Sequence, residues 1–205
     1  TDSKVSANIY FFQLFINEAI ELTQFVRCFN ENAPLDLKVL SIKNTEAPFN
    51  IIQSSKLKEY HYYFSFGAKN HPFAASLLVG FQENLDIEIM KKGAKLFEGI
   101  HYFHKYCTEA TKETVFKREI ISCVIEENDI LTANFFPKTS YVLKVRGNGF
   151  LRYQIRLIMG VLVELGKHEK PLDYIIDSLK ENNDRKFLRN IAPGSGLQLY
   201  HVEFK

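Results

Sequence analysis

The middle of the chain contains three strand-like segments in succession, with only turn signals between them. Runs of high β-propensity cover residues 113–126, 129–136 and 140–147, and the polar clusters 127–129 and 137–138 separate them. No helix-length segment lies between these runs, so the strands pair without crossover helices. The sequence therefore predicts an α+β fold with a mixed or mainly antiparallel sheet flanked by helices.

Other segments predict the remaining elements. Aromatic or alternating patterns are typical of strands, and apolar residues at helical spacing beside capping signals are typical of helices. The further predicted strands are 7–15, 35–40, 60–66 and 196–204. The predicted helices are one that is capped by Asn17 and stopped by Pro34, and those at 86–97, at 150–165 with Gly166 as its C-terminal cap, and at 171–181.

Composition excludes several classes of function. The 205 residues allow one large domain or two small ones that share a core, and the net charge of +2 is compatible with a polyanionic partner without demanding one. Cys28, Cys107 and Cys123 are isolated, so we expect buried free thiols, and the spacing of the six His residues predicts no metal site. No apolar run approaches the roughly 18 residues of a membrane span. Because no organellar transit peptide is visible, we expect a bacterial cytoplasmic protein.

Two arginines on the most apolar predicted helix suggest a buried charge. Arg152 and Arg156 are four positions apart, so both are expected on one helix face. Arg156 has apolar neighbours on both sides and needs a partner, because an unpaired charge in a core is costly. It is either a snorkelling or structurally paired arginine, or one held to pair with a buried carboxylate, which would keep that carboxylate ionised and fix its direction.

The stretch Lys58–Tyr62 and the residue Asp2 indicate a function only in combination with the arginines. Tyr60 and Tyr62 alternate on a strand and share a face, whereas His61 points to the other. Such tyrosines are usually packing residues, but one that faces a site can stack on a nucleobase and relay a proton, and Lys58 on the same face can meet a phosphate. Asp2, taken alone, is typical of a solvated terminal residue.

In this order and spacing, six stretches resemble the TruA-type tRNA pseudouridine synthases. Thr1–Ala7 matches the family signature Gly-Arg-Thr-Asp-Ala-Gly-Val-His-Ala from its third position. The other matches are weaker individually and follow in the family's order. They are Asn32–Leu37 (Asn-x-Pro-x-Asp-Ile), Lys58–Tyr62 (Arg-x-Tyr-x-Tyr), Gly99–Tyr106 (Gly-x-x-Asp/His-Phe-x-x-Phe), Phe150–Arg156 (Phe-Leu-x-x-x-Val-Arg), and Ala192-Pro193 with Gly196-Leu197. The resemblance covers essentially the whole chain.

The resemblance implies roles for individual residues. Asp2 corresponds to the catalytic aspartate, Tyr60 to the active-site tyrosine, and Arg156 to the arginine that pairs with the aspartate. Leu197 corresponds to an apolar contact of the uracil. We add Arg152, Lys4 and Lys58 as candidates that hold the RNA backbone.

The resemblance also implies the substrate and the assembly. It implies a pseudouridine synthase fold with two similar halves around a central cleft, here residues 1–85 and 86–205, and a homodimer in which each tRNA spans both subunits. It implies as substrate uridines of the tRNA anticodon stem-loop, about positions 38–40, which must be flipped out of the RNA before Asp2 can reach them. No metal or organic cofactor is expected, because the isomerisation involves neither redox change nor addition of water.

The chain departs from the family pattern near its start. Lys4 and Ser6 replace a Gly and a His of the signature, and the Gly-Arg, strand and helix that precede the signature are not among the residues printed, so we expect the first half to begin earlier. Three alternatives remain open: a non-catalytic RNA-binding relative, a pseudouridine synthase that acts on other RNA positions, and an unrelated α+β protein with chance matches. Substitution of Asp2 by Asn separates the first of these from an enzyme.

Overall fold

The computed structural model describes residues 2–46, 48–181 and 187–205 and divides the chain into two compact units. Unit 1 comprises residues 1–10 and 55–205, and unit 2 comprises residues 11–54. Every predicted site residue belongs to unit 1. Among the described residues, no helix has both the length and the apolar character to cross a membrane.

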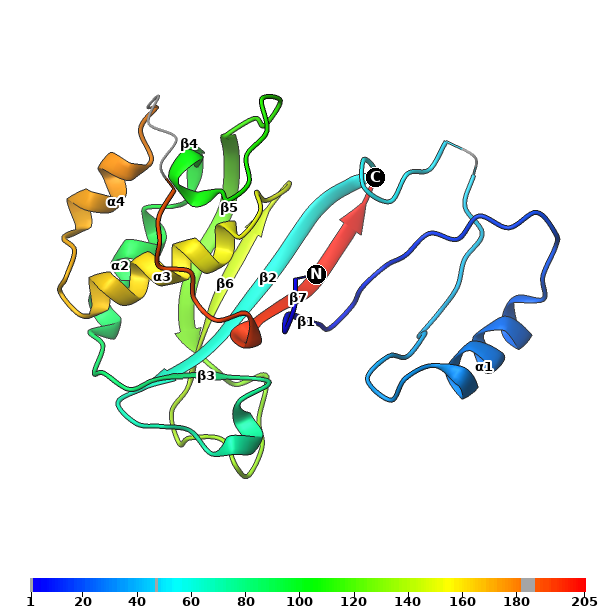
Figure 1. Cartoon of the computed structure of the whole chain (residues 1–205), viewed down its shortest axis with the longest axis horizontal. Helices are drawn as coiled ribbons and strands as arrows, with labels where there is room; N and C mark the ends of the chain where they lie inside the picture. The colour runs from blue at the N-terminus through cyan, green and yellow to red at the C-terminus, as the bar shows by residue number, and fades with distance from the viewer. Residues whose placement is uncertain (1, 47, 182–186) are drawn as a thin grey trace. The chain divides into compact units, whose positions relative to one another are not determined.

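Unit 1 is built on one seven-stranded sheet of order β1-β7-β2-β6-β5-β4, with β3 paired to β2 off this path (Figure 1). The pairs β2–β6, β2–β7, β4–β5 and β5–β6 are antiparallel, whereas β1–β7 and β2–β3 are parallel. The predicted α+β fold with a mixed, mostly antiparallel sheet is therefore confirmed. The strands are β1 (Ser6–Ala7), β2 (Ser55–Phe66), β3 (Val79–Phe81), β4 (Gly99–Tyr102), β5 (Lys117–Glu127), β6 (Tyr141–Gly147) and β7 (Leu197–Phe204).

Helices α2 (Ile87–Lys95) and α3 (Gln154–Gly166) pack against one face of this sheet, and α4 (Leu172–Ser178) follows α3 in the chain (Figure 1). Nearly every residue of α3 is buried, because its sequence is apolar on all sides. The core lies between α3 and the face of the sheet that carries Tyr62 and Phe64. The division at residue 85 and the two similar halves stay predictions, although strands from both sides of that residue form the single sheet.

Unit 2 contains helix α1 (Leu22–Asn32), and the strands predicted at 7–15 and 35–40 are wrong, apart from residue 7 in β1. A strand is stable only beside a neighbour that takes up its backbone hydrogen bonds. Within the described residues, the pairing of β1 to β7 involves only Ser6 and Ala7, and Asn8 N–H adds one bond to Leu199 O. In place of a strand, Phe12 stacks on Phe29 of α1 at 6.0 Å between ring centroids.

Several predicted element ends are corrected by the hydrogen bonds that form there. Helix α1 is capped by Glu21, whose carboxylate accepts from the N–H groups of Thr23 and Gln24, and not by Asn17. Gly166 is the last residue of α3, and the left-handed residue beyond it is His168, with φ 59°. Gly166 lies there because a Cβ would come within 2.7 Å of Met90 Sδ. Helix α4 is shorter than predicted.

The strand predicted at 129–136 is also wrong. Asn128 Oδ1 accepts hydrogen bonds from the N–H groups of Ile130 and Leu131. These bonds turn the chain out of the sheet after β5. The following residues form a loop in which Phe135 and Phe136 pack against buried Tyr63. Local side-chain bonds thus replace the pairing that the residue types favour.

The cysteines follow the prediction in part. Cys107 and Cys123 are buried free thiols, whereas Cys28, on α1, is exposed. Burial raises the pKa of both buried thiols. The expectation that all three are buried is wrong for Cys28, because no residue of α1 is buried.

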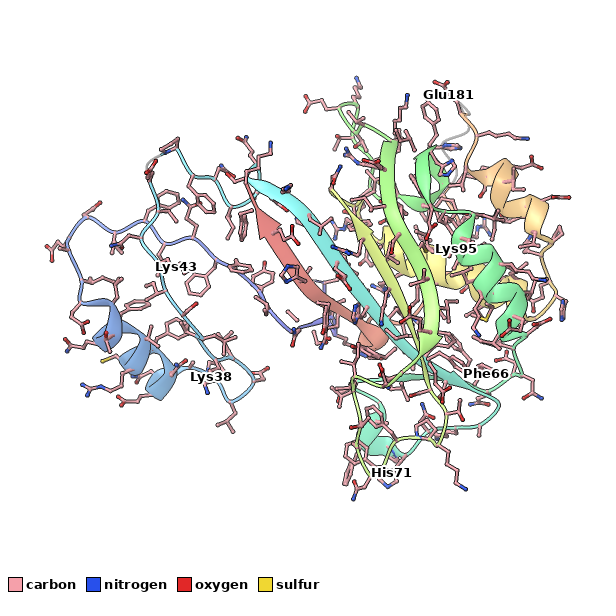
Figure 2. The ribbon with its side chains drawn as sticks, turned by 180° about the vertical axis from the view of Figure 1, so that it is seen from behind. Lys38, Lys43, Phe66, His71, Lys95 and Glu181 are labelled. Carbon is pink, nitrogen blue, oxygen red and sulfur yellow. The ribbon has the colours of Figure 1, made fainter. Side chains whose placement is uncertain are left out.

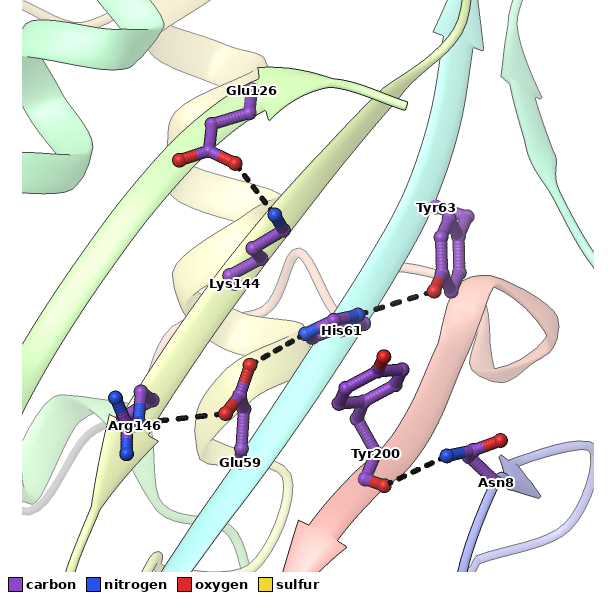
Figure 3. Close-up of polar contacts among 8 residues, drawn as sticks. All are labelled: Asn8, Glu59, His61, Tyr63, Glu126, Lys144, Arg146 and Tyr200. Atoms are coloured by element: carbon purple, nitrogen blue, oxygen red, sulfur yellow. Dashed lines mark hydrogen bonds and ion pairs between the residues drawn. The ribbon is translucent and has the colours of Figure 1, made fainter. Parts of the chain in front are cut away.

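The sheet face opposite α3, seen in Figure 2, carries a polar network. Buried His61 contacts Glu59 Oε1 through Nε2 at 2.7 Å and Tyr63 Oη through Nδ1 at 3.1 Å, as Figure 3 shows. Tyr200 stacks on the His61 ring, and Arg146 pairs with Glu59. Burial lowers the pKa of His61, and the hydrogen bond that the imidazole makes to the Glu59 carboxylate opposes this shift. The prediction that His61 faces away from Tyr60 and Tyr62 is confirmed.

Gly160 allows the backbone of Asn190 to lie close against helix α3. A Cβ at this position of α3 would lie 2.0 Å from Asn190 O, so Gly160→Ala must push the segment around Asn190 away from the helix. We expect a loss of about 1–3 kcal/mol in the free energy of unfolding, measured by urea denaturation. Gly149→Ala is the matched control, because a Cβ there meets nothing within 4 Å. Equal stability of the two variants would contradict this packing.

Candidate active site

Asp2 lies in a tight turn that the sheet anchors. Strand β1 pairs with β7 through Ser6 opposite Gln198, immediately after the turn. Val5 N–H donates to Asp2 O at 3.1 Å, and Lys4 adopts a left-handed backbone with φ 65°. A non-glycine residue in this region costs roughly 1–2 kcal/mol, which the anchored turn must offset. The backbone that follows Asp2 is therefore held first by the turn hydrogen bond and then by the pairing of β1 with the sheet.

Arg156 approaches Asp2 from helix α3. Its Nε donates to Ala192 O at 2.7 Å, and Ala192 N–H donates to Arg156 O at 3.1 Å. Its Nη1 lies 4.0 Å from Asp2 Oδ2, with side-chain exposures of 15% for Arg156 and 33% for Asp2. The arginine is thus held inside the protein, whereas the carboxylate remains open to a ligand. Arg156 therefore lies beside a carboxylate, and whether the pair is structural or serves a reaction stays a prediction.

Tyr60 and Tyr62 reach the same region from β2. Tyr60 packs edge-on against Phe150 at 5.4 Å between ring centroids, and Tyr62 Oη donates to Pro193 O at 2.8 Å. Burial raises the pKa of Tyr60, and the charges of Tyr10 and Asp2 raise it further. Burial likewise raises the pKa of Tyr62, opposed by Arg156. Both phenols therefore stay neutral at physiological pH.

Strand β7 supplies the apolar part of the site. Leu197 and Leu199 are buried and lie opposite Tyr62 and Tyr60 in the β2–β7 register. Paired residues of neighbouring strands point to the same face, so both leucines share the face of the tyrosines. Gly196 precedes Leu197 because a Cβ there would come within 2.8 Å of the Tyr62 ring.

The three basic candidates differ in their surroundings. Lys4 is exposed in the Asp2 turn, and Lys58 is half-buried on β2, on the same strand face as Tyr60. Arg152 precedes α3, which begins at Gln154, so the prediction that it shares a helix face with Arg156 is wrong. Its guanidinium pairs with Glu109 on the surface. The structure thus brings Asp2 and Arg156 together and places Arg152 in a separate ion pair.

Sequence reasoning missed three contributors to this region. The carbonyl of Ala192 fixes Arg156, the side chain of Leu199 extends the apolar surface, and the ring of Tyr153 lies 4.7 Å from Arg156 Cζ. The alternation of β7 is a signal that could have found Leu199. The bond of Arg156 to the Ala192 carbonyl and its contact with the Tyr153 ring depend on the folded backbone, so no sequence pattern marks them.

The arrangement combines a reachable carboxylate, a fixed guanidinium, a neutral phenol and apolar side chains. It can hold a planar, uncharged ring near an anionic oxygen, which suits nucleophilic or general-base chemistry on a nucleoside. In the parts of the chain that the structure describes, no group of three or more His, Cys, Asp or Glu side chains could hold a metal ion.

Comparison with known proteins decides the family. The sequence profile described as "tRNA pseudouridine synthase" matches residues 94–205, which is more than half of the chain. The chain belongs to the tRNA pseudouridine synthase A family. Members of this enzyme family are isomerases that convert uridine in tRNA to pseudouridine, so the predicted recognition and enzyme class are confirmed.

Similarity to curated relatives, which extends over nearly all of this chain, agrees with this assignment. The chain is 29% identical to tRNA pseudouridine synthase A 2 of Desulfotalea psychrophila over 99% of this chain and 77% of that protein. It is 26% identical to tRNA pseudouridine synthase A of Geobacillus sp. over 100% of this chain and 78% of the relative. It is 27% identical to tRNA pseudouridine synthase A 1 of Protochlamydia amoebophila over 100% of this chain and 77% of that protein.

Proposed function

We propose that this tRNA pseudouridine synthase isomerises uridines of the anticodon stem-loop, about positions 38–40, through catalysis by Asp2, acting on bases flipped out of the RNA. The reaction breaks the bond between N1 and C1′, rotates the uracil, and joins C5 to C1′. The proton on C5 is lost, and N1 gains one, so atoms and charge balance without a co-reactant. A group that attacks the base or sugar, or that removes a sugar proton, must begin the sequence.

The ion pair between Asp2 and Arg156 carries this proposal. Asp2 either adds to the base or sugar, or takes the proton next to C1′ to give a glycal, and both routes require its ionised form. The partly buried guanidinium 4.0 Å away places a positive charge beside Asp2, and one third of the Asp2 side chain remains exposed to a substrate. A purely structural ion pair would have no need for the one-third exposure of Asp2.

Tyr60 is assigned to the base. Its ring is half-buried on the same strand face as Tyr62, so a flipped uracil can stack on it above the apolar surface of Leu197. Because the pKa of Tyr60 is raised, chiefly by burial, its hydroxyl is neutral and assists loss of the C5 proton as a relay rather than as a phenolate.

Tyr60→Phe separates these two roles. The ring is kept, so we expect KM for tRNA within about twofold of wild type, whereas loss of the proton relay lowers kcat by about 10²-fold. Steady-state kinetics of pseudouridine formation measure both constants. A variant with wild-type kcat would limit Tyr60 to stacking.

The RNA backbone is assigned to the basic side chains around the site. Lys4 lies two positions after Asp2 in the turn, and Lys58 lies two positions before Tyr60, so both can meet phosphates that flank the flipped nucleotide. A phosphate that binds Arg152 must compete with Glu109. These contacts recognise shape and charge more than sequence.

Mapping the modified positions tests the proposed substrate. Unmodified tRNA transcripts are treated with the protein, and pseudouridine is located by chemical derivatisation that stops reverse transcription. We expect modification confined to the anticodon arm, and modification elsewhere would redirect the assignment to other tRNA positions. We further propose a homodimer, following the family resemblance, and light scattering of the purified protein with and without tRNA measures its mass.

A further inference from the structure

Arg156 must be aimed by groups other than Asp2. At 4.0 Å, the contact between Nη1 and Oδ2 is a charge interaction and too long for a hydrogen bond, so it fixes no direction. Within the described residues, the bond from Nε to Ala192 O fixes one edge of the guanidinium but leaves the group free to turn about that bond. A third contact is needed to set the plane of the guanidinium.

The ring of Tyr153 supplies that contact. Arg156 Cζ lies 4.7 Å from its centroid, within the range in which an aromatic face attracts a guanidinium. Tyr153 precedes Arg156 by three positions at the start of α3, so the ring and the guanidinium belong to adjacent points of one helical turn. The ring covers one face of a cation whose edges meet Ala192 and Asp2.

The backbone of Tyr153 adopts an unfavourable conformation in this position. Its φ is 61° and ψ is 7°, a left-handed conformation in which a tyrosine is uncommon. The turn is closed from both directions: Leu151 N–H donates to Gln154 Oε1 at 2.7 Å, and Gln154 N–H donates to Leu151 O at 3.1 Å. Strained residues that their surroundings lock in place gather at functional sites.

We propose that Tyr153 is a positioning residue for uridine isomerisation, with its ring seating the Arg156 guanidinium in the orientation that serves Asp2. The inference rests on the proposed catalytic role of Asp2. Tyr153 acts through Arg156 and does not itself touch the reacting atoms. The aromatic face is the functional part, and the hydroxyl is dispensable.

Substitutions that separate ring, hydroxyl and backbone test this role. Release of tritium from C5-labelled tRNA gives kcat and KM for the full chain carrying Tyr153→Phe, Tyr153→Leu or Tyr153→Asn. We expect Phe to retain activity within about twofold, and Leu and Asn to lower kcat about tenfold at unchanged KM. Asn tolerates the left-handed backbone, so it removes the ring even where Leu disturbs folding. Tyr174→Leu is the control, because Tyr174 also carries a cation, Lys170, on its ring but belongs to α4.

A double variant shows whether the ring acts through the arginine. In an Arg156→Lys background, Tyr153→Leu is expected to add less than about a twofold loss, because the guanidinium that the ring seats is gone. An additive loss, a Phe variant as impaired as Leu, or wild-type kcat in the Leu and Asn variants would each overturn the inference. An Asp2→Asn protein that remains active would overturn the proposed catalytic role instead, so the two failures are distinguishable.

Discussion

Replacing Asp2 with Asn is expected to abolish pseudouridine formation while tRNA binding persists. The amide has the size of the carboxylate but carries no charge and cannot act as the nucleophile or base, so kcat should fall on the order of 10⁴-fold or more. Asn has nearly the same size and the Asp2 side chain is one-third exposed, so the fold should be unaffected. Chromatography of nucleosides after complete digestion of treated tRNA measures the product, and filter binding measures the affinity.

The exposed Asp129 provides the matched control for this substitution. Asp129→Asn makes the same chemical change in the loop after β5 and should leave both kcat and affinity at wild-type values. An Asp2→Asn protein that forms product at more than about a hundredth of the wild-type rate would show that another group begins the reaction.

Removing the guanidinium of Arg156 is expected to give the second-largest loss. Arg156→Met keeps the unbranched side chain in its apolar surroundings but leaves Asp2 without its cation, so kcat should fall about 10²–10³-fold with little change in KM. The bond to Ala192 O is lost as well, and the melting temperature should drop by a few degrees. Kinetics under saturating tRNA and a thermal melt of the same preparation measure both effects.

Arg152→Met tests whether this loss reflects position or merely one positive charge. Arg152 is four residues away and pairs with Glu109, not with Asp2. Its substitution should raise KM or reduce the salt dependence of tRNA binding, with kcat within about twofold of wild type. A similar fall in kcat for both variants would argue against a specific role of the ion pair between Arg156 and Asp2.

The elements that were predicted well are those whose patterns are local. The aromatic run predicted residues 60–66 of β2, helical spacing predicted α2, and β-propensity with flanking turn signals predicted β6. The segment from residue 7 to 15 has equally strong β-propensity, yet it does not form a strand beyond β1, because a strand depends on a neighbour that the segment itself cannot specify. In the loop after β5, the residue types also favour a strand, but the hydrogen bonds of the Asn128 side chain turn the backbone away from the sheet.

The sequence named candidate residues for the site but could not predict their geometry. Family resemblance pointed to Asp2, Tyr60 and Arg156, and the structure brings Asp2 and Arg156 together. Helical spacing placed Arg152 beside Arg156, which failed because the left-handed Tyr153 delays the start of α3. No propensity marks a tyrosine for that conformation, so the later helix start could not be read from the residues.

Tritium release from C5 of uridine tests the central claim most directly. Transcripts of unmodified tRNA labelled at C5 of uridines in the anticodon arm are incubated with the protein, because joining C5 to C1′ must expel the C5 proton. We expect release by the wild-type protein and none by the Asp2→Asn variant. Tight binding of the same transcripts without any release by the wild-type protein would contradict it.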